Sequence, residues 1–246
     1  MLKRRAFLGL SVVLPVALAT GCRLSTGGLM DAGGDLYKAA TLSPEDVKEL
    51  GKATADAMDA QNSIAKPGST YARRLDKITS SLRNEAGLQL NYKVYMTSDV
   101  NAFACPDGSI RVYSGLMDMM DDDELYFVIG HEIGHVADGD RSDKLRVAYA
   151  ASGARKAAGS VGGIVGSLSR SELGALGEAL INSQFSQSQE YDADAYGLKL
   201  MQKNGKKQQG AVTALRKLAT PGRAPSMFDT HPEPGKRADR IASNLK

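Results

Sequence analysis

Apolar residues recur every three or four positions through much of the chain, which is the pattern of helices that bury one face. A first helix is predicted to begin at Ser43 and to run to about Asn62, because Pro44 suits the first helical position. A second is predicted to begin at Ser69, which can cap it. Further helices are predicted over residues 121–139, 141–157, 172–204, 207–219 and 234–244. The proline-rich stretch 221–234 is predicted to be a loop.

Three shorter apolar stretches have the residue types of strands rather than helices. They cover Tyr92–Met96, Val100–Cys105 and Ser109–Tyr113, and the turn sequence at residues 106–108 joins the last two. These stretches predict a small antiparallel sheet. With the helices around it, the sheet indicates an α+β fold that is mainly helical.

The first 21 residues have the three parts of an export signal: a basic start, an apolar run from Ala6 to Ala19, and small residues before Cys22. The apolar run is too short to cross a membrane as a helix of about 20 residues. Residues 1–21 are therefore predicted to be a signal peptide. The Arg4-Arg5 pair also resembles a twin-arginine signal, so both export routes stay open.

The residues around Cys22 resemble a bacterial lipobox, in which cleavage precedes a cysteine that then carries a lipid. Here Ala19 stands where the lipobox prefers leucine. Lipidation at Cys22, followed by Arg23 rather than aspartate, implies a protein anchored to the outer membrane of the bacterial cell envelope and facing the periplasm. Residues 22–40 are then the lipidated N-terminus and a flexible tether, rich in glycine and small polar residues. Residues 41–246 form one further domain.

The net charge of +3 would normally suggest a nucleic acid or an anionic membrane as a partner. However, all of the excess lies at Lys3, Arg4 and Arg5, inside the predicted signal peptide. Without these three residues the chain has 28 basic and 28 acidic side chains. No nucleic-acid partner is therefore expected.

The sequence His131-Glu132-Ile133-Gly134-His135 fits the H-E-x-x-H pattern of zinc peptidases. It falls within a stretch already predicted to be helical. Four residues advance a helix by about 6 Å and 400°, so the two histidines project from one face and can hold one metal ion. Glu132 is then available as a general base.

A catalytic zinc site normally has a third protein ligand. Glu190 and Asp194 lie one turn apart on a predicted helix and offer carboxylates on the same face. One of them can bind zinc while the other accepts a hydrogen bond from a ligand imidazole. The spacing alone leaves open which carboxylate does which.

Three blocks of the sequence resemble the signature of the HtpX/Oma-type zinc peptidases. They are residues 131–135, residues 185–194, and Thr230-His231-Pro232 together with Arg237. Gln187 stands where that family often has arginine. The similarity extends through residues 91–103, 111–120 and 226–229, along most of the chain after the signal peptide. The resemblance implies a zincin-like metallopeptidase domain over residues 41–246, with the sheet next to the active-site helix and one Zn²⁺ per chain.

The resemblance also assigns roles to individual residues. It implies that Glu190 is the third zinc ligand and that Asp194 orients a ligand histidine. It implies that His231 and Arg237 stabilise the oxyanion of the reaction. It further makes Asn101, Ala102 and Phe103 an edge strand beside the zinc, whose backbone pairs with an extended substrate.

Together these features predict a zinc-dependent endopeptidase that hydrolyses peptide bonds in misfolded or envelope proteins of the periplasm. Glu132 would take a proton from the attacking water. The partners of the protein would be protein or peptide substrates, the outer membrane and another outer-membrane protein or protease. The alternative is a periplasmic chaperone or outer-membrane assembly factor that binds extended segments with little turnover. The complete set His131, Glu132, His135 and Glu190 favours the enzyme, because binding alone needs no general base.

Overall fold

The computed structural model describes residues 42–152, 163–220 and 225–245. The helices are α2 (Pro44–Gln61), α3 (Thr70–Ile78), α4 (Ser114–Met119), α5 (Asp122–Ala137), α6 (Asp140–Ala151), α7 (Gly163–Gly166), α8 (Arg170–Ile181), α9 (Gln187–Lys203), α10 (Gln209–Leu218), α11 (Pro225–Thr230) and α12 (Pro234–Asn244). The strands are β1 (Asn84–Glu85), β2 (Leu88–Gln89), β3 (Asn91–Tyr95), β4 (Ala102–Ala104) and β5 (Ser109–Tyr113). The predicted signal peptide, the lipidation residue Cys22 and the tether lie outside the described residues.

The three predicted strands form one sheet with the order β3-β5-β4. Strands β4 and β5 pair antiparallel as the predicted hairpin, but β3 pairs with β5 in parallel. The sheet is therefore mixed, and the expectation of a wholly antiparallel sheet was wrong in this detail. The reason is the strand order: β5 lies between β3 and β4, and two chain reversals separate β3 from β5, so these neighbours run in the same direction.

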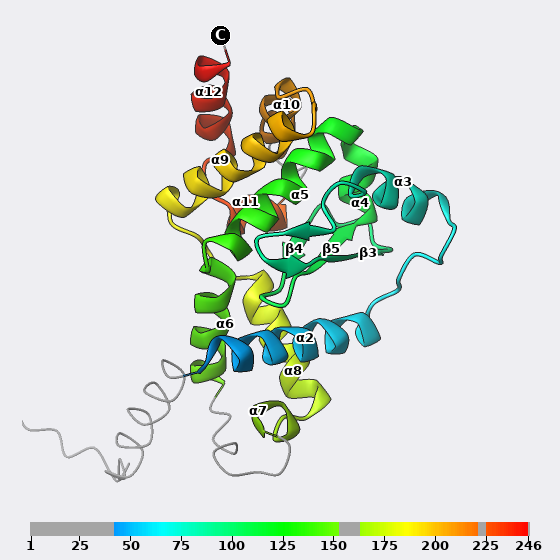
Figure 1. Ribbon diagram of the computed structural model, residues 1–246, viewed down its shortest axis with the longest axis vertical. Coiled ribbons are helices and arrows are strands. Elements are labelled where there is room, and N and C mark those ends of the chain that lie inside the picture. Colours follow the sequence, from blue (N-terminus) through cyan, green and yellow to red (C-terminus); the bar gives the residue numbers. More distant parts are fainter. Residues whose placement is uncertain (1–41, 153–162, 221–224, 246) are drawn as a thin grey trace, which may run out of the picture.

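The sheet is covered by helices on both faces (Figure 1). On one face Ala102, Ala104, Ile110 and Val112 join the hydrophobic cluster that contains the apolar residues of α3 and α5. On the other face Phe103 and Cys105 belong to the cluster that contains residues of α2 and α8. Successive side chains of a strand point to opposite faces, so strands buried on both sides read as nearly continuous apolar runs.

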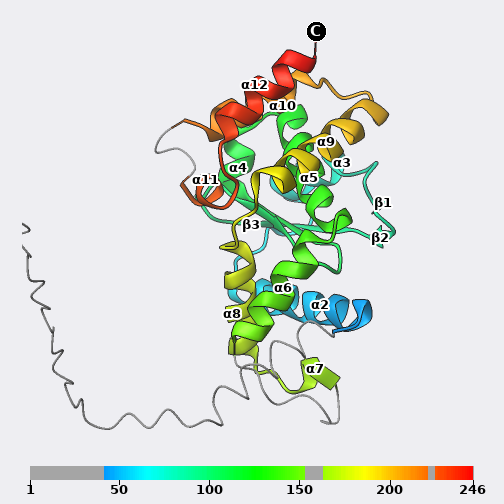
Figure 2. The same ribbon diagram turned by 90° about the vertical axis from the view of Figure 1, so that its left-hand side faces the viewer.

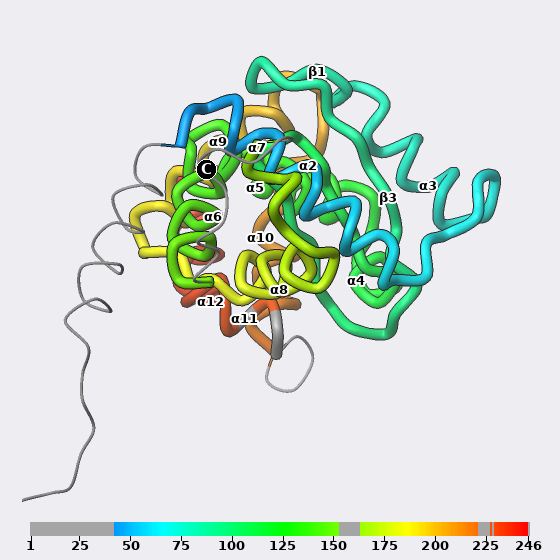
Figure 3. The backbone as a smooth tube through the Cα atoms, turned by 90° about the horizontal axis from the view of Figure 1, so that it is seen from below, coloured from blue at the N-terminus to red at the C-terminus, as the bar shows by residue number. Residues whose placement is uncertain are grey.

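Helix α2 is fixed at its start and along one face. Ser43 and Asp46 form a reciprocal capping box, in which each side chain accepts a hydrogen bond from the other residue's backbone N–H. Val47, Leu50, Thr54 and Met58 then recur at helical spacing and are buried. They pack α2 on α6 and α8, as the view from below shows (Figure 3).

Helices α5 and α9 lie side by side through the centre of the molecule (Figure 2). Glycines allow their close approach. A Cβ on Gly134 would lie 2.9 Å from Ala193 Cα, and one on Gly130 would lie 3.0 Å from Gly197 Cα. Larger side chains at these positions would push the helices apart. The small residues of α5 and α9 therefore set the distance between the side chains that the two helices present to each other.

The predicted helical stretch 172–204 is two helices, α8 and α9, with a break at residues 182–186. Ser186 ends the break, because it forms a capping box with Gln189 and so begins α9. Three short helices were missed: α4, α7, and α11 inside the predicted loop 221–234. The other predicted helices agree with the structure, apart from their ends and residues 153–157, which lie outside the described part of the chain.

The predicted α+β class is confirmed: the described residues are mainly helical, and the small sheet lies against α5. Within this part of the chain, every helix is too short or too polar to cross a membrane.

Candidate active site

Four side chains from three separate parts of the chain converge on one point. His131 and His135 come from α5, Glu190 comes from the first turn of α9, and His231 follows α11. One possible ligand atom from each lies within 4.8 Å of the others, and all four residues are buried.

The separations between these atoms suit a zinc ion. His131 Nε2 lies 3.1 Å from His135 Nε2 and 3.2 Å from His231 Nδ1. Glu190 Oε1 lies 3.0 Å from His231 Nδ1 and 3.4 Å from His135 Nε2. Ligands at about 2.0–2.1 Å from a tetrahedral zinc are about 3.3–3.4 Å apart. The set therefore has the spacing of a four-ligand zinc shell, and His231 lies within it.

The hydrogen bonds behind the two α5 histidines make their inner nitrogens bare acceptors. His131 Nδ1 donates to Asp194 at 3.0 Å, and His135 Nδ1 donates to Asp140 at 2.8 Å. Burial lowers the pKa of His131 to about 4, so its imidazole is neutral. Two lone pairs and the Glu190 carboxylate thus face one another at short distance. A cation at their centre relieves this arrangement, so the residues present fit zinc.

Asp140 is a site residue that the sequence reasoning missed. Gly139 adopts a left-handed conformation, with φ of 83°, and turns the chain from α5 into α6. Asp140 then reaches back to His135, and Gln189 donates to its second oxygen. A glycine followed by aspartate directly after the H-E-x-x-H helix was the available signal.

Arg237 binds the two carboxylates of α9. Its Nε and Nη2 donate to the two oxygens of Asp194 at 2.9 and 2.6 Å, and its Nη1 donates to Glu190. Burial alone would raise the pKa of Asp194, but Arg237 and then His131 outweigh burial and hold this pKa below its usual value. The guanidinium thus lies behind the ligand set, which differs from the position expected of an oxyanion donor.

Glu132 is completely buried beside the ligand set. Its Oε2 accepts a hydrogen bond from Arg141. Its Oε1 has no hydrogen-bond partner and lies 3.5 Å from His231 Nε2. Burial raises the pKa of this carboxyl, but the positive charge of Arg141 is the first of the effects that outweigh burial, so the pKa is lowered. Glu132 is therefore a carboxylate with one oxygen unpaired.

Phe185, in the break between α8 and α9, covers the ligand set from one side. Its ring stacks on His135, with ring centres 3.9 Å apart, and lies 5.3 Å from the ring of His231. None of the four ligand candidates is more than 5% exposed. A peptide bond can therefore reach the set only after side chains around it move.

The predicted substrate strand, Asn101 to Phe103, lies at an edge of the sheet and against α5. The hydrogen bonds between residues 101 and 113 and between 105 and 109 show that the Phe103 backbone pairs with β5. Ala102 and Ala104 therefore turn their backbone groups toward the unpaired edge of the sheet, where both residues are buried. The Asn101 side chain already accepts the Ala102 N–H at 2.9 Å.

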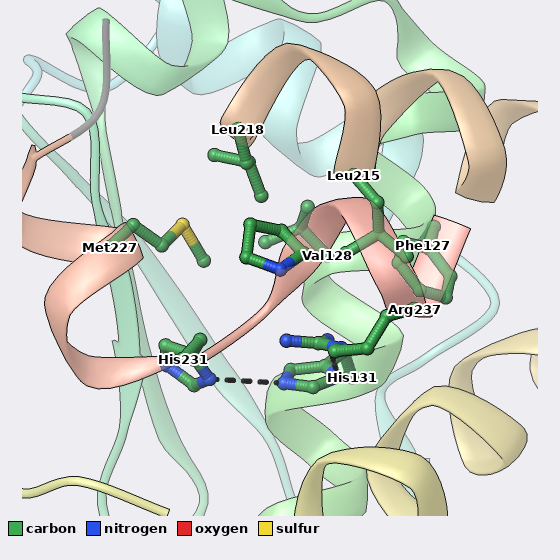
Figure 4. A pocket seen from close by; sticks show the side chains of 9 residues that line it. Phe127, Val128, His131, Leu215, Leu218, Met227, His231 and Arg237 are labelled. Carbon is green, nitrogen blue, oxygen red and sulfur yellow. Dashed lines mark hydrogen bonds between the residues drawn. The ribbon is translucent and has the colours of Figure 1, made fainter. Parts of the chain in front are cut away.

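An apolar pocket lies between α5, α10, α11 and α12, beside His131 and His231 (Figure 4). Its apolar lining is Phe127, Val128, Leu215, Leu218, Met227 and Pro234. The cavity has a volume of about 10 Å³ and so holds no more than a water-sized group as it stands.

Comparison with known proteins agrees with this geometry. Residues 69–244 match the model of peptidase family M48. The chain is 47% identical to the metalloprotease LoiP of Escherichia coli over 99% of this chain and 98% of that protein. It is 44% identical to the metalloprotease YcaL of the same organism over 95% and 96%. A shorter similarity, 34% over 31% of this chain and 27% of its relative, links it to the protease HtpX of Chromohalobacter salexigens.

The family match spans all four ligand candidates, and both long relatives are aligned over nearly their whole length. The predicted enzyme class and metal are thereby confirmed. The chain belongs to peptidase family M48 and is a zinc metalloendopeptidase.

Proposed function

We propose that this metallopeptidase cleaves misfolded or cell-envelope proteins in the bacterial periplasm, with Glu132 as its general base. One observation carries the proposal: Glu132 Oε1 is buried beside the ligand set and has no hydrogen-bond partner. Leaving a buried carboxylate oxygen without a hydrogen-bond partner costs free energy, and in native structures such an oxygen usually has a functional reason. A water molecule between Glu132 and the ligand set would give this oxygen its partner.

In the proposed mechanism, His131, His135 and Glu190 would hold the zinc ion, which would supply a Lewis acid for the scissile carbonyl and for the attacking water. Glu132 accepts the proton of the attacking water at Oε1 and returns it to the nitrogen of the leaving amine.

His231 would have two roles in this proposal. Its Nδ1 completes the four-ligand shell, and a closed shell leaves no place for substrate or water. Because His231 lies between α11 and α12 rather than within α5 or α9, it can turn away without moving the other three ligands. Its imidazole would then be free to donate a hydrogen bond to the oxyanion, as the resemblance implies.

Arg237 acts differently from the oxyanion donor expected at first. Its contacts with Asp194 and Glu190 support a positioning role: it fixes the Glu190 carboxylate and, through Asp194, the His131 ring. Asp194 keeps the role expected from the resemblance.

The substrate is proposed to bind as an added strand at the edge of β4. Ala102 and Ala104 supply the outward backbone groups. Because both residues are buried, the side chains that cover this edge, together with the Asn101 side chain on the Ala102 N–H, would move to admit the substrate. Phe103 supports this strand from the opposite face, where its ring packs against Tyr95 and Tyr113. The apolar pocket beside His131, once widened from its present volume of about 10 Å³ by movement of its lining, would accept an apolar side chain next to the scissile bond.

Zinc content and proteolysis test the enzymatic part of the proposal. The purified protein should hold one zinc per chain and cleave a denatured model protein such as casein, and a zinc chelator should stop cleavage. Glu132→Gln should keep zinc but lower kcat by about 10²–10⁴-fold. Glu178→Gln, an exposed change on α8, is the matched control and should change neither. Undiminished cleavage by Glu132→Gln contradicts the mechanism, and a wild type without metal or activity contradicts the function.

Anchoring of the protein to the outer membrane through Cys22 is tested separately. Cells supplied with labelled palmitate should label the wild type, and the labelled protein should fractionate with the outer membrane. Cys22→Ser should abolish the label and release the protein from that membrane. A wild type that carries no lipid contradicts this part of the proposal.

A further inference from the structure

Arg141 is a buried cation that the mechanism described so far does not use. It is the second residue of α6 and lies directly after Asp140. The left-handed turn at Gly139 brings both residues back toward α5. Asp140 contacts His135, and Arg141 contacts Glu132. One glycine turn thus delivers two successive side chains to two residues of the H-E-x-x-H motif.

The surroundings of Arg141 leave it few ways to move. Its side chain is 2% exposed, and the guanidinium carbon lies 4.7 Å from the centre of the Phe185 ring. Its Nη1 donates to the carbonyl of Leu180 at 3.4 Å, and its Nη2 donates to Glu132 Oε2. Across the described ranges, Glu132 is the only carboxylate within ion-pair distance of this guanidinium.

We propose that Arg141 positions the general base: it holds Glu132 Oε2 so that Oε1 alone faces the ligand set. This inference rests on the proposed role of Glu132. Without Arg141, the carboxylate can rotate and present either oxygen, or approach the metal as a further ligand. A guanidinium is suited to this task, because Nη1 and the Phe185 ring hold its plane in place while Nη2 alone reaches Glu132 Oε2. An ammonium carries one nitrogen and lacks this rigid plane.

The buried pair of Arg111 and Asp59 lies away from the ligand set and serves as a structural comparison for Arg141. Arg111 is as buried as Arg141 and binds Asp59 with two nitrogens, at 2.7 and 2.9 Å. That pair joins β5 to α2 on the face of the sheet opposite α5. Arg111→Lys is therefore the control for a change in a buried arginine that pairs with a carboxylate away from the ligand set.

The experiment compares Arg141→Ala, Arg141→Lys and Arg111→Lys in the full-length protein. Both Arg141 variants should keep one zinc per chain, since Arg141 contacts none of the ligand candidates. Arg141→Ala should lower kcat by about 10²-fold with little change in KM, because a misplaced base affects the transition state alone. Methylguanidinium in solution should restore much of the kcat of Arg141→Ala, and Arg141→Lys should restore less. Arg111→Lys should lower the melting temperature but leave kcat unchanged.

A measurement on the zinc-free protein covers the case in which Arg141→Ala fails to fold. Arg141→Gln alone should lower the melting temperature strongly, because it leaves the Glu132 charge buried and unpaired. The double variant Glu132→Gln/Arg141→Gln should recover part of that loss, which shows direct coupling. Additive effects there, or loss of zinc together with kcat, or no rescue by methylguanidinium, would overturn the inference. If Glu132→Gln itself stays active, the proposed function fails instead.

Discussion

His135 and Asp140 are joined by a hydrogen bond of 2.8 Å, which crosses the turn between α5 and α6. Asp140 accepts the Nδ1 proton of His135 and so leaves Nε2 bare toward the ligand set. Asp140→Asn should therefore weaken zinc binding by about 10–100-fold. Competition with a chelator measures this. Asp138→Asn, an exposed change two residues away, should bind zinc as the wild type does, and equal affinities of all three proteins would contradict the role of Asp140.

Gly134→Ala should separate the two helices that carry the ligands. Its Cβ would lie 2.9 Å from Ala193 Cα, which is backbone and cannot turn aside. We expect a loss of about 1–3 kcal/mol in the free energy of unfolding, together with weaker zinc binding. Gly235→Ala is the control, since its Cβ would make only an ordinary contact at 3.8 Å with Ala219. Urea unfolding of both variants measures the difference, and a variant at residue 134 as stable as the wild type would contradict the tight packing.

Arg237→Lys should loosen the Glu190 carboxylate without removing a positive charge. Lysine cannot bind both oxygens of Asp194 as the guanidinium does. The expected result is a loss of about 2 kcal/mol in stability and about 10-fold in zinc affinity. Arg240→Lys, on the exposed side of the same helix, should have little effect. If Arg237→Lys lowers kcat but leaves zinc affinity unchanged, an oxyanion role regains support over the positioning role.

Leu218→Ala should change which substrates are cleaved. Leu218 lines the apolar pocket, and its truncation enlarges a cavity of about 10 Å³. Cleavage sites mapped by mass spectrometry in a peptide mixture should shift toward larger apolar residues next to the scissile bond. Leu173→Ala, in the cluster around α2, should cost a similar stability, about 2–3 kcal/mol, with the cleavage preference unchanged. An unchanged preference in Leu218→Ala would show that the pocket does not bind substrate.

Asp59 should make stability depend on acid pH. Burial raises the pKa of Asp59, but hydrogen bonds from Arg111, Lys93 and Tyr95 outweigh burial and lower it. A lowered pKa stabilises the fold above the unfolded value of about 3.9, and this contribution is lost as the pH falls through the folded value. Asp59→Asn should cost about 3 kcal/mol at pH 7 and less at pH 3. Urea unfolding at both values checks this, and a constant difference would contradict it.

Much of the site followed from local sequence. The helix over α5, with both histidines on one face, depends only on residues four apart, and so does the shared face of Glu190 and Asp194. Which carboxylate enters the ligand set did not follow from spacing, because either residue fits one turn of a helix. Glu190 enters because it lies in the first turn of α9, after the break within the stretch 172–204, whereas Asp194 one turn later contacts His131 Nδ1 and Arg237.

The parallel pairing of β3 with β5 was missed for a related reason. The hairpin of β4 and β5 is a local structure set by its turn. The pairing of β3 with β5 instead depends on tertiary contacts, including those between β3 and α3. The roles of Asp140 and Arg141 were also missed, because only the backbone direction at Gly139 turns them toward α5.

The sequence by itself determined most of the longer helices, the sheet segments, the H-E-x-x-H motif and the zinc peptidase family, since all of these depend on short-range spacing or on matching residues. The tertiary structure alone decided that His231 completes the ligand set, that Arg237 lies behind it, and that Glu132 keeps one free oxygen. The first two facts depend on contacts between residues 41 to 106 positions apart, which form only when α12 and the end of α11 pack against α5 and α9. The third depends on Arg141, which the turn at Gly139 brings back to Glu132. The spacing of residues along the sequence does not reveal that packing.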